Sequence, residues 1–247
     1  MSNANISGLN RITEGLSLED SLRWISECFP GRVAFSLGFG KEGMIIADAI
    51  FRNNLNIRVF TLDTGRLFPE THELFERVHL RYNKPIEVFF PNGAEVEKLV
   101  STKGPASFYH SVDNRKECCH VRKVRPLERA LQNTDIWISG VRAEQSEHRK
   151  GFGRFMWDDR FQLIKFHPLI DWKKTEVERH INIHRIPYNK LHDQGFVSIG
   201  CAPCTRAVAA GEEERNGRWW WESSKKECGL HANFFQNVSS KKEVAKV

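Results

Sequence analysis

The chain has 247 residues, of which 40% are apolar and 28% charged, a composition typical of a globular protein rather than a disordered one. It contains no run of about eighteen apolar residues, and residues 1–5 lack the basic start and apolar core of a signal peptide. We therefore expect no membrane partner and a cytoplasmic location. A formal net charge of +6, spread along the chain rather than gathered in one arm, favours a small anionic ligand over nucleic acid.

A glycine loop between a strand and a helix is the first candidate binding element. Apolar residues at steps of four and three predict a leading helix over 17–28, and a short buried strand follows at 33–35. A helix through 44–50 comes after the loop, so backbone N–H groups and a helix N-terminus would point at a phosphate. An ordinary tight turn stays open, because the loop has neither the Walker spacing nor a full G-x-G-x-x-G. The loop residues expected to bind a nucleotide are Ser36, Gly38 and Gly40.

Strands and helices alternate after this loop. A strand at 57–62 ends on Asp63, where an acidic residue often binds a ribose hydroxyl, and Pro69 opens a helix through Tyr82. Two more strands are expected at 86–90 and 136–139. The alternation predicts an α/β fold with a mostly parallel sheet flanked by helices, and ligands at the carboxyl ends of the strands.

The second half of the chain carries less regular patterns. A helix over 120–132 is expected directly after Cys118-Cys119, and the polar residues 140–149 predict a mobile loop. Residues 161–168 predict a strand or a sheet edge, and Thr175 begins a helix with capping-type chemistry.

Four of the six cysteines form two pairs, Cys118-Cys119 and Cys201-Ala202-Pro203-Cys204. In a reducing compartment such pairs indicate a metal site rather than disulfides, and C-x-x-C suits zinc or iron–sulfur equally. Neighbouring side chains normally diverge, so binding one zinc through both members of the first pair is awkward. A cubane cluster presents separated irons and accepts such a pair more readily, so we favour a four-iron four-sulfur cluster over zinc.

Cys228 lies outside these pairs, beside a glycine and three residues before His231. Positive charge from Arg215 and Arg218 would lower the pKa of a nearby thiol, and only the thiolate is nucleophilic. An inert cysteine is the alternative interpretation of Cys228. Cys28, alone in the leading helix, is expected only to pack.

Together these motifs resemble the assimilatory adenylylsulfate reductases, which are relatives of the phosphoadenylylsulfate reductases. The resemblance extends from about residue 30 to His231, most of the chain. It rests on ordered matches: the glycine loop, Leu62–Arg66, Cys118-Cys119 with Lys123, Gly140–Arg142, Cys201–Cys204, Gly211–Trp219 and Lys226–His231.

This resemblance implies an adenine-nucleotide α-hydrolase-like, Rossmann-like fold in which Cys228 is the nucleophile. It also implies one 4Fe-4S cluster held by Cys118, Cys119, Cys201 and Cys204. Members that take only the 3′-phosphorylated substrate usually lack these pairs, so adenylylsulfate is the expected substrate. The sequence ends sixteen residues after His231, which leaves no room for the redoxin domain fused in plant-type relatives. An external thioredoxin or glutaredoxin is therefore implied as reductant.

The implied reaction has two steps. Cys228 attacks the substrate's sulfur and AMP leaves, after which a redoxin thiol releases sulfite from the Cys–S–sulfonate. Cations must meet the phosphate and sulfate charges, and by resemblance they are Lys123, Arg149, Arg215, Arg218 and His231. Arg142 is a further candidate ligand, with a solvated salt bridge as its alternative role, and the three tryptophans at 219–221 are expected to pack.

Other functions stay open at this point. Phosphoadenylylsulfate could be the substrate, alone or together with adenylylsulfate. An ATP-dependent RNA sulfurtransferase would share the fold, but the pyrophosphate motif that it needs is missing. A zinc-stapled nucleic-acid-binding module has only the positive charge in its favour. We expect residues 1–231 to form one domain with a catalytic segment near 211–231 and a disordered tail over 232–247, and the oligomeric state, a homo-oligomer included, stays open.

Overall fold

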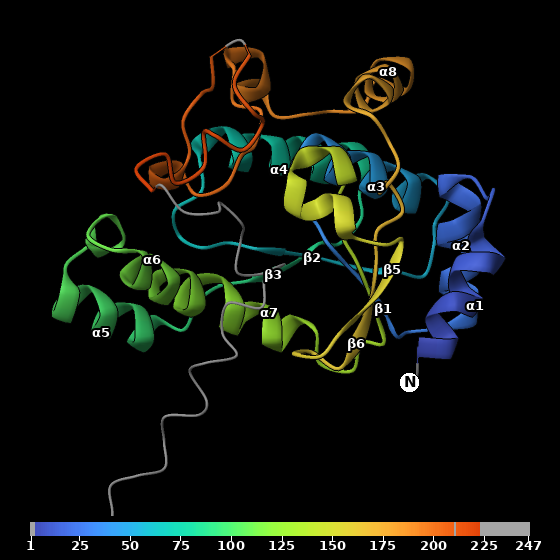
Figure 1. Cartoon of the computed structure of the whole chain (residues 1–247), viewed down its shortest axis with the longest axis horizontal. Coiled ribbons are helices and arrows are strands. Elements are labelled where there is room, and N and C mark those ends of the chain that lie inside the picture. Colours follow the sequence, from blue (N-terminus) through green and yellow to red (C-terminus); the bar gives the residue numbers. More distant parts are fainter. Residues whose placement is uncertain (1–2, 210, 223–247) are drawn as a thin grey trace, which may run out of the picture.

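A twisted sheet with helices on both faces organises the computed structural model (Figure 1), which describes residues 3–209 and 211–222. The predicted nucleophile Cys228, the candidate ligand His231 and the predicted tail over 232–247 lie outside the described residues. Within the described ranges the sheet has six strands in the order β3-β2-β1-β4-β6-β5. They are β1 Val33–Ser36, β2 Arg58–Leu62, β3 Glu87–Phe89, β4 Ile136–Ile138, β5 Phe155–Asp158 and β6 Leu163–Phe166.

All neighbouring strands pair in parallel except the edge strand β5, which runs antiparallel to β6. The predicted α/β fold with a mostly parallel sheet is confirmed. The helices that connect and cover the strands are α1 Asn3–Thr13, α2 Leu18–Cys28, α3 Lys41–Arg52, α4 Pro69–Tyr82, α5 Gly93–Lys103, α6 Val112–Cys119, α7 Arg125–Ala130 and α8 Lys174–His184. None of the helices in the described part of the chain is long and apolar enough to cross a membrane.

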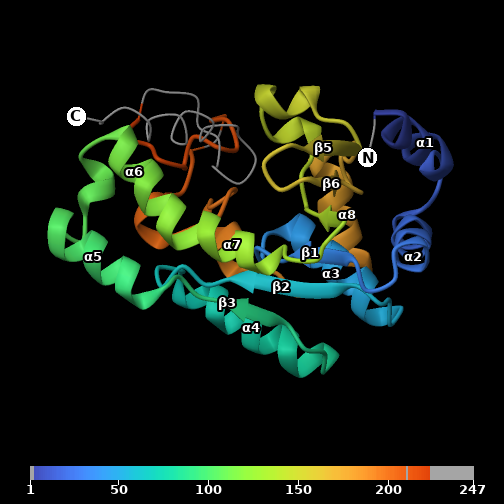
Figure 2. The ribbon, with the colours of Figure 1, turned by 90° about the horizontal axis from the view of Figure 1, so that it is seen from below.

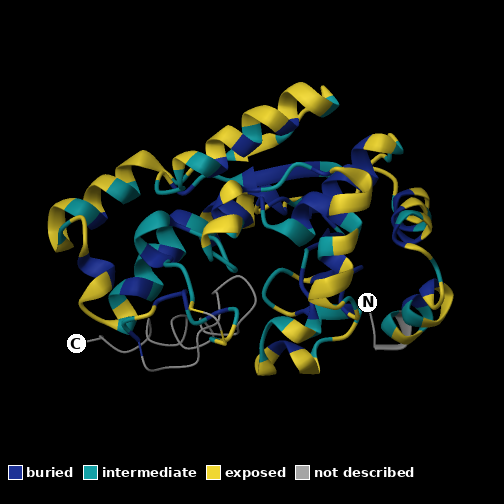
Figure 3. Cartoon of the chain, turned by 90° about the horizontal axis from the view of Figure 1, so that it is seen from above, coloured by how far each residue is buried: buried dark blue, intermediate teal, exposed yellow. Residues whose placement is uncertain are grey.

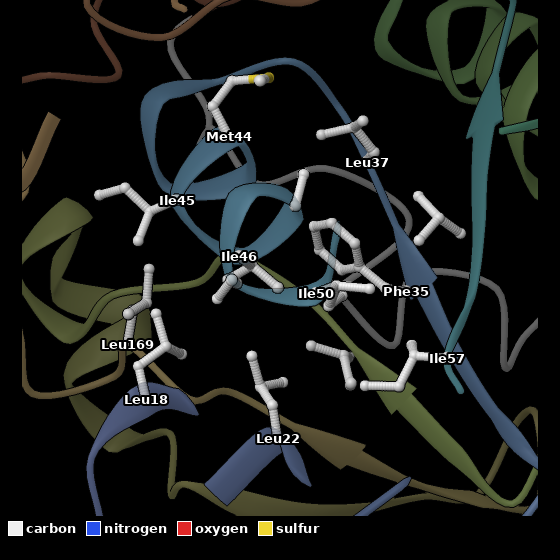
Figure 4. Packing of buried hydrophobic residues seen from close by; sticks show 14 of the residues in the cluster. Leu18, Leu22, Phe35, Leu37, Met44, Ile45, Ile46, Ile50, Ile57 and Leu169 are labelled. Atoms are coloured by element: carbon white, nitrogen blue, oxygen red, sulfur yellow. The ribbon is translucent and has the colours of Figure 1, made fainter. Parts of the chain in front are cut away.

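The central strands β1 and β4 are buried on both faces of the sheet, to which their successive side chains point alternately. Val33 and Phe35 pack with α2, α3, α4 and α8, whereas Ala34 between them packs with α7. Figure 4 shows this larger cluster, in which Leu22, Phe35 and Ile46 come from three different elements. Figure 2 shows the same sheet from below, and in Figure 3 the central strands are largely buried while the outward faces of the covering helices are exposed. The all-apolar sequence of β4, Ile136–Ile138, follows from burial on both sides.

Local chemistry explains several helix boundaries. The side chains of Ser17, Asn92 and Ser111 accept hydrogen bonds from the first turns of α2, α5 and α6. Pro69 occupies the first position of α4, where its missing N–H costs nothing, and Asn83 ends that helix in a left-handed conformation. The start of α8 differs from the prediction. Its cap is Lys173, whose N–H donates to Glu176 at 2.7 Å, and Thr175 lies inside the helix.

Three further sequence predictions differ from the structure in part. The helix predicted over 120–132 is found as a π-helical turn, His120–Val124, followed by α7, Arg125–Ala130. It is not a separate helix after the cysteine pair, because Cys118 and Cys119 are the last residues of α6, which continues into the π turn without a break. Residues 140–149, predicted as a mobile loop, include the 3₁₀ helix Ala143–Gln145 and the start of a second one, Glu147–Gly151. Finally, the strand found within 161–168 is internal, since an unpredicted strand, β5, forms the edge beside it.

The strand order reverses between β1 and β4. Strands β2 and β3 extend the sheet from one side of β1, whereas β4 pairs with its other side. In open α/β sheets such a switch point leaves a crevice outside the carboxyl ends of the strands. The loops after β1, β2 and β4 therefore define where a ligand would bind.

Candidate active site

A cleft lies at this switch point. It is lined by the glycine loop from Ser36 to Gly40, by Thr61, Leu62 and Thr64 at the end of β2, and by Ser139–Val141 after β4. Gly140 allows the β4 loop to approach α3 closely, because a Cβ there would lie 3.1 Å from both Glu42 Cβ and Gly43 N. The predicted residues Ser36, Gly38 and Gly40 all line this cleft. Gly40 is the N-cap of α3, so the N-terminus of that helix faces the cleft as well.

Four predicted cations converge on the same cleft from different parts of the chain: Lys123, Arg149, Arg215 and Arg218. The three arginines are each less than a tenth exposed. Arg218 Nη1 lies 3.4 Å from the Ile199 carbonyl oxygen, and its guanidinium stacks over Trp219. Buried cations around a cavity strongly favour an anionic ligand, since water screens them little there.

Two other predicted ligands, Asp63 and Arg142, are not among the residues that line the cleft. Asp63 Oδ1 accepts a hydrogen bond from Gly65 N at 2.8 Å, and its Oδ2 lies 3.0 Å from His72 Nε2. Asp63 therefore shapes the turn after β2 in this structure.

Arg142 is neither a solvated ion pair nor a cleft-lining cation. Its side chain is 2% exposed, and it donates to Glu42 at 2.7 Å and to Glu144 at 2.8 Å. A third carboxylate, Glu214, lies 3.3 Å from its Nη2. Burial opposes the charge, but these carboxylates raise the pKa of Arg142 above the ordinary arginine value. Glu42 and Glu214 line the cleft, so Arg142 neutralises two cleft carboxylates without lining the cleft itself.

The two cysteine pairs come together around one cavity. Cys118 and Cys119 at the end of α6 face Cys201 and Cys204, and Lys123 lines both this cavity and the cleft. Three further cations surround the thiols, namely Arg66, Arg115 and Arg122. The structure therefore brings the four predicted metal ligands next to the predicted anion site.

The thiols of this cavity differ in acidity. Burial opposes ionisation of Cys201, yet the nearby Lys123 charge and the Thr64 hydroxyl, 3.2 Å from its sulfur, lower its pKa. Burial and the Cys201 charge raise the pKa of Cys204 to about 11. Burial also raises the pKa of Cys118, against the charge of Arg66. Cysteine thiolates, not thiols, bind metals, so a metal centre would have to overcome these costs.

The residues around the thiols suit an iron–sulfur group. Trp219 Nε1 is buried in this cavity and has no hydrogen-bond partner among the described residues, so it could donate to a sulfur atom inside. Phe108 and Trp219 are buried and pack in one cluster with Cys201 and Cys204. Within the described ranges, no group of three or more His, Cys, Asp or Glu side chains that could hold a metal ion is present.

The segment 211–222 is folded against the second cysteine pair. Trp219 N donates to the Cys204 carbonyl at 3.2 Å, and Arg206 N donates to the Gly217 carbonyl at 2.9 Å. Gly200 gives Arg218 its room, since a Cβ there would lie 2.3 Å from the guanidinium. These contacts aim Arg215 and Arg218 at the cleft.

Sequence reasoning missed several residues of the site. Thr64 lines the cleft and contacts Cys201. Glu214 also lines the cleft, whereas Arg66 and Arg122 line the cysteine cavity. Thr64 and Arg66 stand in the motif Leu62–Arg66, in which only Asp63 was predicted to bind a ligand. Residue type alone does not predict Glu214, because a carboxylate repels an anionic ligand. Its place in the site depends on Arg142, a counter-ion that is distant in sequence.

Comparisons with known proteins agree with this arrangement. Residues 32–207 match the model of the phosphoadenosine phosphosulfate reductase domain family. The adenosine 5′-phosphosulfate reductase of Allochromatium vinosum is 48% identical over 204 residues, covering 82% of this chain and 80% of that protein. The enzyme of the same name from Sinorhizobium fredii is 44% identical over 229 residues, covering 92% and 91%.

One solved structure is of a phosphoadenylyl-sulfate reductase, and another shares only the fold. The phosphoadenylyl-sulfate (PAPS) reductase from Candida auris, in a phosphate complex, superimposes with a TM-score of 0.73 at 26% identity. That match covers 84% of this chain and 98% of the fungal one. Yeast FAD synthetase, at 17% identity and a TM-score of 0.51, shares the fold. The chain therefore belongs to the phosphoadenosine phosphosulfate reductase family, with adenosine 5′-phosphosulfate reductases among its relatives.

Proposed function

We propose that this protein reduces adenylylsulfate to sulfite and AMP in sulfate assimilation, with Cys228 as the nucleophile. The observation that carries the proposal is the convergence of Lys123, Arg149, Arg215 and Arg218 on a cleft that adjoins four cysteines. The relatives named adenosine 5′-phosphosulfate reductases support adenylylsulfate as the substrate.

The residues that line the cleft support a binding mode for the charged part of the nucleotide. The glycine loop and the α3 N-terminus would receive the phosphate end through backbone N–H groups. The four cations would balance the phosphate and sulfate charges and stabilise the AMP that leaves. Asp63 and His231 stay proposed ligands of the ribose and of the anionic groups, and Arg142 is assigned instead to support of the cleft.

The chemistry is two-step covalent catalysis. The Cys228 thiolate attacks the sulfur of adenylylsulfate, the bond from sulfur to the phosphate oxygen breaks, and AMP leaves with those electrons. A thiolate of thioredoxin or glutaredoxin then attacks Cys228 Sγ and expels sulfite, which takes the electron pair of the sulfur–sulfur bond. The second redoxin thiol resolves the mixed disulfide, so the dithiol supplies both electrons. Because this step needs reduced thiols, we place the protein in the cytoplasm.

Cys118, Cys119, Cys201 and Cys204 are the proposed ligands of one 4Fe-4S cluster. Four thiols around one cavity suit a group that offers a separate iron to each sulfur. When bound, the cluster would supply a fixed charge next to the cleft. Lys123 lines both spaces and would be held between that charge and the substrate.

The test follows sulfite release and the mass of the protein. Adenylylsulfate should give sulfite when thioredoxin is supplied, and phosphoadenylylsulfate, assayed alongside, should give much less. Without thiol, wild-type protein should stop after one turnover carrying about 80 Da of added sulfonate on Cys228, and thioredoxin should remove it. Cys228→Ser should bind adenylylsulfate but form neither adduct nor sulfite. An adduct that maps elsewhere, or turnover by the serine variant, would refute the assignment.

A further inference from the structure

A buried ion pair joins the cysteine helix to the last described residue of the chain. Arg115 Nε and Nη2 donate to the two carboxylate oxygens of Glu222 at 2.8 and 2.9 Å. The side chains are 3% and 4% exposed. Such a two-point contact fixes the orientation of both groups as well as their distance.

Arg115 also contacts the cysteine site itself. It lies one helical turn before Cys119 on α6, forms a side-chain hydrogen bond with Cys119, and lines the cysteine cavity. Its guanidinium stacks over Trp219, 4.6 Å from the ring centroid. Arg115 thus connects the first cysteine pair with segment 211–222.

The second cysteine pair holds the same segment from the other side. Trp219 N donates to the Cys204 carbonyl, and Thr205 forms an antiparallel bridge with Arg218. Figure 2 shows the red end of the described chain beside α6. Both pairs therefore meet at residues 218–222, although they lie far apart in the sequence.

The anchored position of Glu222 limits how far Cys228 can lie from it along the chain. Cys228 follows Glu222 by six residues, so its Cα lies at most about 20 Å from that anchor. Trp221, one residue earlier, is held separately by ring contacts with Phe108 and Tyr109, so the ion pair shortens the free segment by one residue and fixes the direction in which it starts. A nucleophile that must approach one sulfur atom in line loses rate when its search volume grows.

We propose that Arg115 and Glu222 are positioning residues for Cys228. The pair fixes the base of the catalytic segment to the cysteine helix, so the filled cysteine site and the reach of the nucleophile are coupled. A buried ion pair adds little stability compared with apolar packing, but it fixes the position of residue 222 relative to α6. The inference rests on the proposed role of Cys228.

The informative variant is Glu222→Gln, because Glu222 belongs to neither set of lining residues, whether of the cleft or of the cysteine cavity. Asp158→Asn is the matched control. Asp158 forms a buried ion pair with Lys165 between β5 and β6, with side chains 7% and 11% exposed. Both variants change one buried carboxylate to its amide, but only the first touches the catalytic segment.

Four quantities are measured for the full chain with its cluster. In Glu222→Gln, the single-turnover rate of Cys228 sulfonation, followed by intact mass, should fall at least tenfold. Its dissociation constant for AMP and its iron content should stay within twofold of wild type. Amide hydrogen exchange at residues 216–222 should accelerate. Asp158→Asn should keep the sulfonation rate and that exchange within twofold of wild type.

Equal slowing in both variants, or none in Glu222→Gln, would overturn the positioning role. A tenfold loss of AMP affinity in Glu222→Gln would overturn it as well, because it would place Glu222 in nucleotide binding. If wild-type protein formed no adduct, the proposed function would fail. The anchor would still be tested by hydrogen exchange, and unchanged exchange in Glu222→Gln would refute it.

Discussion

At the residue scale, the arginines of this protein divide into those that face the cleft and those that support it. Arg215 and Arg218 line the cleft, whereas Arg142 lies beneath it and binds Glu42, Glu144 and Glu214. Burial raises the pKa of Glu214, and the charge of Arg142 opposes that effect. Without Arg142, two carboxylates would face an incoming anion with no counter-ion.

Replacing these arginines should therefore have different effects. Arg142→Met should lower the free energy of unfolding by about 3–5 kcal/mol, because it leaves buried carboxylates unpaired. Arg215→Met should instead weaken adenylylsulfate binding by about ten- to a hundredfold, since it removes a charge-assisted contact of roughly 1.5–3 kcal/mol. Both are measured in a Cys228→Ser background, by denaturant unfolding and by calorimetric titration. If Arg142→Met and Arg215→Met lost the same affinity and had the same stability, Arg142 would instead be a substrate-binding residue.

At the scale of elements, the helical run from α6 through the π turn to α7 forms the cysteine site. The side of this run that faces the cavity carries two rows of residues spaced four apart. One row is Arg115, Cys119 and Lys123, and the other is Cys118 and Arg122. Cysteines adjacent in sequence thus both line one cavity. A π turn is rare and frequently marks a functional site, and here it carries Lys123.

Removing one cysteine should reveal the metal that this element binds. Wild-type protein purified without oxygen should be brown and hold about four irons per chain. Cys118→Ser should lose the colour and most of the iron and activity, because one ligand position is gone. Cys28→Ser is the matched control, since Cys28 is exposed at the end of α2 and belongs to neither pair. One zinc per chain, without visible absorption, would contradict the cluster assignment.

At the scale of the whole molecule, the buried His167 and the half-buried His192 tie stability to pH. Burial, with the charges of Lys165 and Arg149, lowers the pKa of His167 to about 3. Burial and Lys41 lower the pKa of His192 to about 4. The ordinary value is 6.5, so below it the unfolded chain binds protons that the folded chain does not. Stability from these residues is complete above pH 6.5 and is lost as pH falls toward the folded pKa values.

The size of this effect follows from linkage. One pKa unit corresponds to about 1.4 kcal/mol, so each histidine should cost about 2 kcal/mol of unfolding free energy between pH 7.5 and pH 5. His167→Gln should be less stable at pH 7.5 but should lose about 2 kcal/mol less than wild type over that interval. Denaturant unfolding at both pH values measures the difference. The same loss in both proteins would mean that His167 titrates normally when folded.

The sequence alone determined those features that depend on local periodicity and on residue type. Apolar spacing and end signals located α2, α4 and strands β1 to β4, because they act within one element. Alternation of strands and helices predicted the parallel sheet, and hence that the loops after β1, β2 and β4 would line one cleft. The cysteine pairs and the basic residues of the family motifs were visible as residue types at fixed spacings.

Only the tertiary structure decided what depends on contacts between distant segments. It placed Arg142 outside the lining of the cleft, because two of its three carboxylate partners, Glu42 and Glu214, lie 100 and 72 positions away in the sequence. It added β5 at the sheet edge, and it placed the cysteine pair inside a helical run, where register depends on packing rather than propensity. The pairing of Arg115 with Glu222 spans 107 positions, and no local pattern specifies such a contact.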